Sequence, residues 1–294
     1  MAQPIDGATG KVAKLRHYLA AGDLAGLGHE AKQYMQWTAQ RAKRMQVGFQ
    51  WRSREFKINV GDQLIKFGYN SGSQYGEDRI LAGLLRGHPR PFLVDVGAHD
   101  GRSLSNSLPF ILRGWRAILL EPLPRVYDQL CHEHRNHPQA ICLNMAASDQ
   151  AGSLPLFLGS DGDIGMTSTL CQDSNEWFDT HRTEESIQVK TDKLTNILDQ
   201  HDWPTDFGLL LVDAEGMDYE VLTGLDFTRY RPTIVVTEEY VGNPEKHAAK
   251  YQLLRANGYL LHVRLGETNT IWVEDAYARA RQLAEIDNSM PAPA

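Results

Sequence analysis

The stretch PFLVDVGAHDG, residues 91–101, decides the fold that this sequence adopts. A mostly apolar run leads into Asp95, and a turn that carries Gly97 and Gly101 follows at once. This pattern is typical of a buried parallel strand that ends in a tight loop and opens a helix. In open α/β sheets, ligands bind just outside such carboxyl ends of strands. The sequence therefore predicts a ligand crevice beside Asp95.

A second acidic strand end indicates which kind of ligand this crevice takes. Residues 117–120 (AILL) predict the next strand, and Glu121 follows it directly. Glu121 lies 24 positions after Gly97 (121 − 97), close to the spacing of roughly 20 residues at which a carboxylate binds ribose hydroxyls. We therefore expect a cofactor that contains a nucleoside.

The charge of the loop separates two such cofactors. A dinucleotide site requires G-x-G-x-x-G, because the pyrophosphate must approach a helix N-terminus. Here His99 occupies the position of the middle glycine, and Asp100 adds a negative charge that would repel a phosphate. S-adenosylmethionine has an adenosine, a sulfonium and an ammonium but no phosphate, so we favour it. A degenerate NAD site, in an NAD-dependent oxidoreductase, is the alternative.

Composition excludes several classes of protein. The 294 residues are 42% hydrophobic and 23% charged, as in an ordinary globular protein. The formal net charge of −7 argues against a general nucleic-acid binder, which needs a basic surface. Three irregularly placed cysteines do not form a disulfide framework, and no apolar run reaches the length of a membrane span. We expect a cytoplasmic protein.

The N-terminal part of the chain has a different pattern. Residues 11–20 and 29–45 predict helices, and ten Lys or Arg stand against three acids between residues 11 and 57. We predict a helical extension over residues 1–60 and a catalytic domain over residues 61–294. The favoured interpretation is a solvated extension packed on the main domain. A basic arm that docks a partner or an acidic substrate is the alternative.

The rest of the chain alternates between strand and helix patterns, beginning with a hairpin at residues 56–69. Helices are predicted over residues 102–115, 124–136, 193–201, 245–257 and 276–286, and Asp192 is expected to cap the third of them. Further strands are predicted at residues 141–145, 187–190, 209–212, 232–237, 259–265 and 270–274, and residues 146–149 are expected to form a loop. Asp218 and Glu220 are expected to be surface acids that complement a helix dipole. The irregular segment 159–181 is where we expect the acceptor to be recognised.

An ordered series of motifs resembles the FkbM family of class I S-adenosylmethionine-dependent methyltransferases. The resemblance covers roughly residues 70–265. Its motifs are Ser73-Gln74-x-Gly76-Glu77-Asp78, DVGAHDG at 95–101, Glu121-Pro122, Ala147-Ser148-Asp149, Thr191-Asp192, Asp213-Ala214-Glu215-Gly216, Glu220-Val221-Leu222-x-Gly224, Arg231-Pro232 and Glu238. One residue departs from the family, which usually has Asn where this chain has His99.

The resemblance implies a doubly wound α/β fold with a seven-stranded, mostly parallel, Rossmann-like sheet. It also implies methyl transfer to a hydroxyl of a sugar, glycolipid or secondary metabolite, and hence a small-molecule or glycan partner. The loop from Asp95 to Gly101 would hold the methionine moiety, Glu121 the ribose, and Asp149 would approach the adenine. The full set of expected cofactor-binding residues is Gln74, Glu77, Asp95, Gly97, Ala98, His99, Asp100, Gly101, Glu121, Pro122, Ala147 and Asp149. For Gln74 and Glu77, a purely structural role at a helix start is the alternative.

An acceptor hydroxyl benefits from a base, and Asp213 is the first candidate because it directly follows a buried strand. Glu239, Glu215 and His99 are the further candidates. Several carboxylates at one edge raise one another's pKa, which suits a base near neutral pH. A divalent cation on Asp213, Glu215 and Glu238 is an alternative that we do not favour, because these ligands come from two strands and would point to opposite faces. A protein that binds the nucleoside without methyl transfer is a further alternative.

Overall fold

The computed structural model describes residues 55–60, 63–68, 73–160, 165–171, 181–239, 243–265 and 268–281. The chain divides into two units, Met1–Asn70 and Ser71–Ala294. In the first unit, β1 (Glu55–Val60) and β2 (Gln63–Gly68) form an antiparallel hairpin, as the alternating pattern predicts. The helices predicted before residue 55 lie outside the described residues, and the domain boundary after residue 60 stays a prediction.

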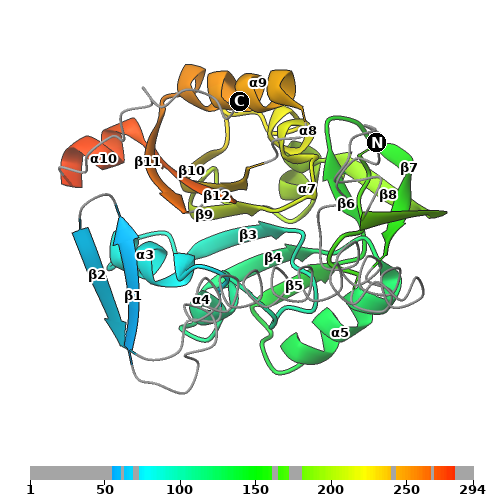
Figure 1. The fold of residues 1–294 in the computed structure, drawn as a ribbon, viewed down its shortest axis with the longest axis horizontal. Helices are drawn as coiled ribbons and strands as arrows, with labels where there is room; N and C mark the ends of the chain where they lie inside the picture. The colour runs from blue at the N-terminus through cyan, green and yellow to red at the C-terminus, as the bar shows by residue number, and fades with distance from the viewer. Residues whose placement is uncertain are drawn as a thin grey trace, which may run out of the picture. The chain divides into compact units, whose positions relative to one another are not determined.

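The second unit is built on a seven-stranded sheet with the order β11-β12-β10-β9-β3-β4-β5 (Figure 1). Neighbouring strands from β10 to β5 are parallel, whereas β12 is antiparallel to both β10 and β11. The predicted mostly parallel, seven-stranded sheet is therefore confirmed. Its strands are β3 (Phe92–Val96), β4 (Arg116–Leu120), β5 (Ala140–Leu143), β9 (Asp206–Val212), β10 (Arg231–Glu238), β11 (Tyr259–Leu265) and β12 (Asn269–Glu274).

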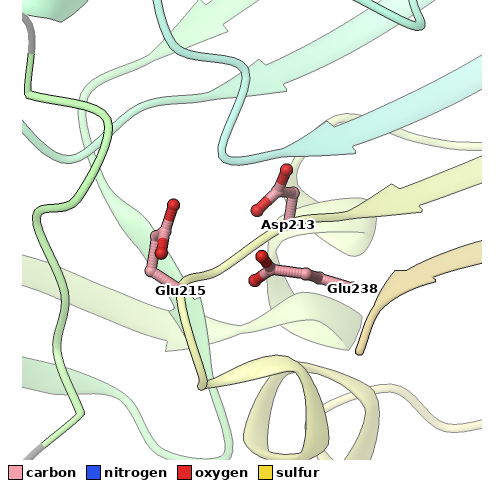
Figure 2. Close-up of side chains that lie close together, drawn as sticks. All are labelled: Asp213, Glu215 and Glu238. Carbon is pink, nitrogen blue, oxygen red and sulfur yellow. The ribbon is translucent and has the colours of Figure 1, made fainter. Parts of the chain in front are cut away.

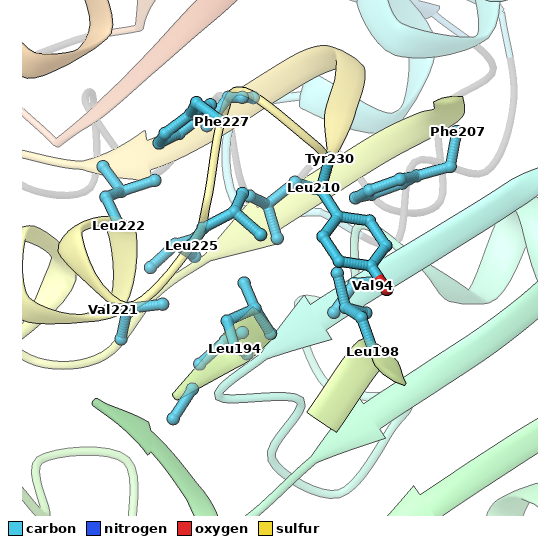
Figure 3. Packing of buried hydrophobic residues seen from close by; sticks show 14 of the residues in the cluster. Val94, Leu194, Leu198, Phe207, Leu210, Val221, Leu222, Leu225, Phe227 and Tyr230 are labelled. Carbon is cyan, nitrogen blue, oxygen red and sulfur yellow. The ribbon is translucent and has the colours of Figure 1, made fainter. Parts of the chain in front are cut away.

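Helices cover both faces of this sheet, because its central strands are apolar on both sides. Val94 and Leu210 point to one core, where they pack against α7 (Leu194–Gln200), α8 (Asp218–Thr223) and α9 (Pro244–Ala256). Figure 3 shows part of this core. The alternate residues Leu93 and Leu209 point to the other core, which contains residues of α3 (Glu77–Leu84), α4 (Leu108–Ile111), α5 (Pro124–His134) and α10 (Asp275–Arg281). Among the described residues, no helix is long and apolar enough to cross a membrane.

Two local predictions about helices are wrong. The helix predicted over residues 102–115 is reduced to α4, because Leu104 has a left-handed φ of 55° and Pro109 lies in the first turn of the helix. Pro109 therefore lies at the start of the helix, where proline is favoured. Asp192 does not cap α7, because Lys193 occupies the N-cap position. The side chain of Asp192 instead accepts hydrogen bonds from Lys193 N and Asn196 Nδ2.

A second, three-stranded sheet lies beside the carboxyl ends of the main strands. It contains β6 (Ala146–Ser148), β8 (Arg182–Lys193) and β7 (Gly152–Gly159) in that order. The loop predicted at residues 146–149 is therefore wrong, because Ala146–Ser148 pair in parallel with β8. Leu156 of β7 packs in one cluster with Leu123, which follows β4, and Met217, which follows β9. This sheet thus forms a wall beside the loops that leave the main sheet.

Gly97 lets β3 and β9 approach each other closely at their carboxyl ends. It has a left-handed φ of 85°, and its N–H donates to Leu120 O at 3.0 Å. A Cβ atom at this position would lie 1.9 Å from the carbonyl oxygen of Asp213. Only glycine fits this contact, which brings the strand ends that carry Asp95 and Asp213 together.

We expect Gly97→Ala to lower the free energy of unfolding by at least about 2 kcal/mol, because the added Cβ meets backbone and the φ is unfavourable. Gly83→Ala is the matched control. No atom lies within 4 Å of a Cβ at Gly83, which sits in helix α3. Alanine should therefore be neutral or stabilise by about 0.5–1 kcal/mol. Thermal and urea unfolding of both variants test this, and equal stability of the two would contradict the close contact.

Candidate active site

A cavity of about 660 Å³ lies at the carboxyl ends of β3, β4, β9 and β10. This volume is within the range of about 300–1,000 Å³ that is usual for small-molecule sites. Six carboxylate residues line it, namely Asp95, Glu121, Asp213, Glu215, Glu238 and Glu239. The lining contains no Lys or Arg among the described residues, and His99 is its one histidine. The cavity is therefore suited to a cationic ligand.

Most of the expected cofactor-binding residues line this cavity, and four do not. Those that line it are Gln74, Asp95, Gly97, Ala98, His99, Glu121, Pro122 and Ala147. Those outside its lining are Glu77, Asp100, Gly101 and Asp149. For these four residues, contact with a ligand stays a prediction.

Two of the four residues fix the local structure instead. Glu77 is fully buried and accepts hydrogen bonds from Tyr75 N at 2.8 Å and Asn269 Nδ2 at 2.7 Å. It thereby ties the start of α3 to β12. Asp100 accepts from the backbone N–H groups of Arg102 and Ser103 at 2.9 and 2.6 Å. It therefore shapes the turn that follows β3.

Of the other two residues, Gly101 is buried against α5 and Asp149 is exposed. A Cβ at Gly101 would lie 2.6 Å from side-chain atoms of Leu130 and His134, so this glycine lets the loop pack on α5. Asp149 is exposed, and its Oδ1 accepts from Ser148 Oγ at 3.1 Å.

Glu121 is held rigidly in the cavity wall. It is 7% exposed, and it accepts from His99 N at 3.1 Å and from Leu123 N at 2.8 Å. Burial raises the pKa of Glu121 to about 7, although the two backbone donors act in the opposite direction. Each carboxylate oxygen has a second lone pair, so the group can still accept hydrogen bonds from a ligand.

Asp95 lies at the end of β3, facing the same cavity. Burial raises its pKa to about 6, and a hydrogen bond with the Ser107 side chain opposes this shift. Within the part of the chain that the structure describes, Asp95 forms no ion pair. A cation that enters the cavity would therefore be the first charged partner of this carboxylate.

Asp213, Glu215 and Glu238 converge at the ends of β9 and β10 (Figure 2). One carboxylate oxygen of each lies within 4.8 Å of the others. Glu215 has a left-handed φ of 48°, and its carbonyl oxygen accepts from Thr169 Oγ1 at 2.6 Å. The expectation that these side chains point to opposite faces is wrong, because this turn directs Glu215 back toward the strand ends.

Burial, together with repulsion from neighbouring acids, makes Asp213 and Glu238 of this group basic. The side chain of Asp213 is exposed to the cavity. Burial by the surrounding residues nevertheless raises its pKa to about 7, and the negative charge of Asp218 acts in the same direction. The pKa of Glu238 is raised well above its ordinary value, first by burial and then by the charges of Asp213 and Glu215. At neutral pH, at least one carboxylate of the group can therefore accept a proton.

Glu239 differs from this group because its carboxylate is fully engaged. It accepts from His247 Nε2 at 2.5 Å, from Tyr251 Oη at 2.9 Å and from Thr270 Oγ1 at 2.9 Å. Burial acts to raise its pKa, but the His247 hydrogen bond and the Lys250 charge outweigh it, so the pKa is lowered. These donors disfavour Glu239 as a base and make it a support for the end of β10.

The sequence interpretation missed two parts of the site. Asp218 is buried at 3% exposure and not at the surface, and it accepts from Ala214 N at 3.0 Å and Glu238 N at 2.8 Å. It thus fastens the ends of β9 and β10 together.

The segment 165–171 also contributes to the cavity wall, through Met166 and Leu170 among others. The sequence predicted that the irregular segment 159–181 recognises the acceptor, but it did not indicate which residues of that segment line the cavity.

Three solved methyltransferase structures are similar to this chain. An FkbM methyltransferase from Methylobacillus flagellatus is 14% identical with a TM-score of 0.38, and the match covers 64% of this chain and 45% of that one. A precorrin-6y C5,15-methyltransferase from Geobacter metallireducens is 12% identical with a TM-score of 0.38, covering 74% and 94%. A TehB-like SAM-dependent methyltransferase from Corynebacterium glutamicum is 12% identical with a TM-score of 0.34, covering 83% and 99%. No curated protein sequence matches the chain.

The family comparison is more specific than these structural similarities. A sequence model of the methyltransferase FkbM domain matches residues 95–261, which is more than half of the chain. The matched region begins at Asp95 and contains four of the seven main strands in full (β4, β5, β9 and β10) together with all six acidic cavity residues. The chain therefore belongs to the FkbM family of methyltransferases.

Proposed function

We propose that this protein transfers a methyl group from S-adenosylmethionine to the hydroxyl of a small-molecule or glycan acceptor. The observation that carries the proposal is a cavity lined by six carboxylates and by no Lys or Arg among the described residues. A sulfonium and an ammonium are stabilised in such a field, whereas the pyrophosphate of NAD would be repelled. Membership of the FkbM family supports the same donor.

The residues of the cavity fit this cofactor in their chemistry. Asp95, as an ionised acceptor without an ion-pair partner among the described residues, suits the amino-acid end. Glu121 offers carboxylate lone pairs to the ribose hydroxyls. Pro122 and Ala147, which also line the cavity, would form part of the wall around the nucleoside. Gly97, Ala98 and His99 would complete the wall on the side of β3.

Catalysis needs alignment and a proton acceptor. The cofactor supplies an already activated methyl group, so holding the acceptor oxygen in line supplies much of the acceleration. Asp213 takes the hydroxyl proton as the new C–O bond forms and the C–S bond breaks. Burial keeps Asp213 basic, and the charges of Asp218 and Asp95 act in the same direction. A positioned base of this kind contributes about 10²–10⁴-fold.

A divalent cation is the second candidate for activating the hydroxyl. The approach of three carboxylate oxygens to within 4.8 Å of one another favours it, since such oxygens are the ligands of Mg²⁺ and Ca²⁺. We retain the base mechanism because the pKa of Asp213, at about 7, suits proton transfer without a metal. Turnover that is lost in EDTA and restored by Mg²⁺ would reassign the three carboxylates to a metal site.

Two substitutions separate cofactor binding from chemistry. Glu121→Ala should weaken the binding of S-adenosylhomocysteine by at least about tenfold, since it removes both acceptor oxygens from the ribose site. Asp213→Asn should change this affinity by less than about threefold and lower turnover by about 10²–10⁴-fold. Calorimetry measures the first effect, and transfer of a labelled methyl group to a hydroxyl-rich extract measures the second.

The control for Asp213→Asn is Asp206→Asn, at the opposite end of β9, where the side chain is 61% exposed. This control should behave as wild type in both assays. Equal cofactor affinity in wild type and Glu121→Ala would refute the ribose assignment. Tighter binding of NAD than of S-adenosylmethionine would refute the donor.

The raised pKa of Asp213 also predicts how stability depends on pH. In the ligand-free protein its pKa is about 7, against an ordinary value of 3.8. The contribution of Asp213 to the stability of the folded protein is therefore greatest below about pH 4, where the carboxyl is protonated in both the folded and the unfolded chain. It is lost as the pH rises through 7, where the folded protein loses this proton. At pH 8, Asp213→Asn should raise the free energy of unfolding by about 1 kcal/mol, once solvent screening is allowed for, and so raise Tm by about 2–4 °C. At pH 4 it should give no gain in Tm. A lower Tm of this variant at pH 8 would contradict the claim that the ionised Asp213 carboxylate destabilises the fold.

A further inference from the structure

We propose that the carboxamide oxygen of Asn106 accepts a hydrogen bond from the α-ammonium group of the bound cofactor, beside the carboxylate of Asp95. This inference rests on the proposed use of S-adenosylmethionine. It adds a binding residue that neither the motif series nor the acidic strand ends indicate. Asn106 would act as a neutral second acceptor, and Asp95 would supply the charge.

The first observation is an unpaired acceptor at the cavity. Asn106 lines the cavity, and its Oδ1 is buried without a hydrogen-bond partner among the described residues. About nine in ten or more buried polar groups in proteins are paired, because an unpaired one loses its hydration without compensation. A ligand in the cavity that donates a hydrogen bond would remove this deficit. The χ2 torsion of asparagine is soft, so the carboxamide can turn to meet it.

The second observation is the attachment of Asn106 to Asp95 through its neighbours. The Ser107 side chain hydrogen-bonds the Asp95 carboxylate. Ser105 Oγ accepts from Leu108 N at 3.0 Å and lies 3.2 Å from Ser107 Oγ. Both neighbours of Asn106 are thus buried and fixed at the start of α4. This arrangement holds Asn106 close in the fold to the carboxylate that would bind the same ammonium.

The third observation is that three backbone donors of the loop after β3 are already used. Gly97 N and Ala98 N both donate to Leu120 O, and His99 N donates to Glu121. These N–H groups are not available to the amino-acid end of the ligand, so side chains are expected to contribute to its binding. An ammonium has three donors and needs several acceptors. Asp95 and Asn106 are acceptors of the cavity at this end of the loop.

Two nucleosides test the proposal, since they differ in the amino-acid end. S-adenosylhomocysteine carries the α-ammonium, and 5′-methylthioadenosine lacks the whole amino-acid group. By calorimetry at pH 8, Asn106→Ala should weaken S-adenosylhomocysteine binding by about 10–100-fold and methylthioadenosine binding by less than about twofold. Asn106→Asp keeps the acceptor oxygen, so it should bind S-adenosylhomocysteine within about threefold of wild type, or more tightly.

Arg102→Ala is the control on the same segment, because Arg102 is exposed, lies outside the cavity lining and contacts Glu133. It should leave both affinities unchanged. The thermal stability of ligand-free Asn106→Ala adds an independent readout. It should equal or exceed that of wild type, because the deleted oxygen has no partner among the described residues.

Three results would overturn the proposal. An unchanged affinity of Asn106→Ala for S-adenosylhomocysteine would exclude a contact between Asn106 and the ammonium group. An equal loss of affinity for both nucleosides would show that Asn106 acts on a part of the ligand other than the ammonium. A loss in Asn106→Asp as large as in Asn106→Ala would show that Asn106 donates and does not accept. If wild type binds neither nucleoside, the proposed function itself fails, whereas the first three results leave it intact.

Discussion

The structure depends on the close approach of β3 and β9 at their carboxyl ends. The backbone of Gly97 and the carbonyl of Asp213 meet at a distance that no side chain tolerates. This contact brings the ends of two buried strands to one edge, and each end carries a carboxylate. Glu121 of β4 and Glu238 of β10 join the same edge, because parallel neighbours in register end together. The sheet thus concentrates negative charge where it opens.

This concentration of charge opposes stability, and the protein treats its acids in two ways. Asp218 and Glu239 accept several hydrogen bonds within the fold and hold β9 and β10 in place, although burial still raises the pKa of Asp218 to about 6. Asp95, Asp213 and Glu238 have raised pKa values, first because they are buried. Buried carboxylates with raised pKa values are typical of functional sites. A cationic ligand would supply the missing compensation.

Sequence patterns predicted the strands well, because a short apolar run such as LLLV at 209–212, followed directly by turn residues, is typical of a strand buried in the middle of a sheet. They also predicted that Asp95, Glu121 and Asp213 share one cavity, since acids after parallel strands meet at one edge. They failed where tertiary contacts decide. Asp218 looks like a surface acid in a first helical turn, and only the position of β10 buries it. Asn106 has no pattern of its own, and its significance depends on a missing hydrogen-bond partner.

A crystal structure of the protein with S-adenosylhomocysteine tests the central claim most directly, namely that the acidic edge of the sheet binds a sulfur nucleoside. The account predicts density for the nucleoside in the cavity at the ends of β3 and β4. The ribose hydroxyls should lie within hydrogen-bond distance of Glu121, and the thioether should face Asp213. Density for the nucleoside elsewhere on the protein, with Glu121 and Asp213 unchanged and unbound, would contradict the account.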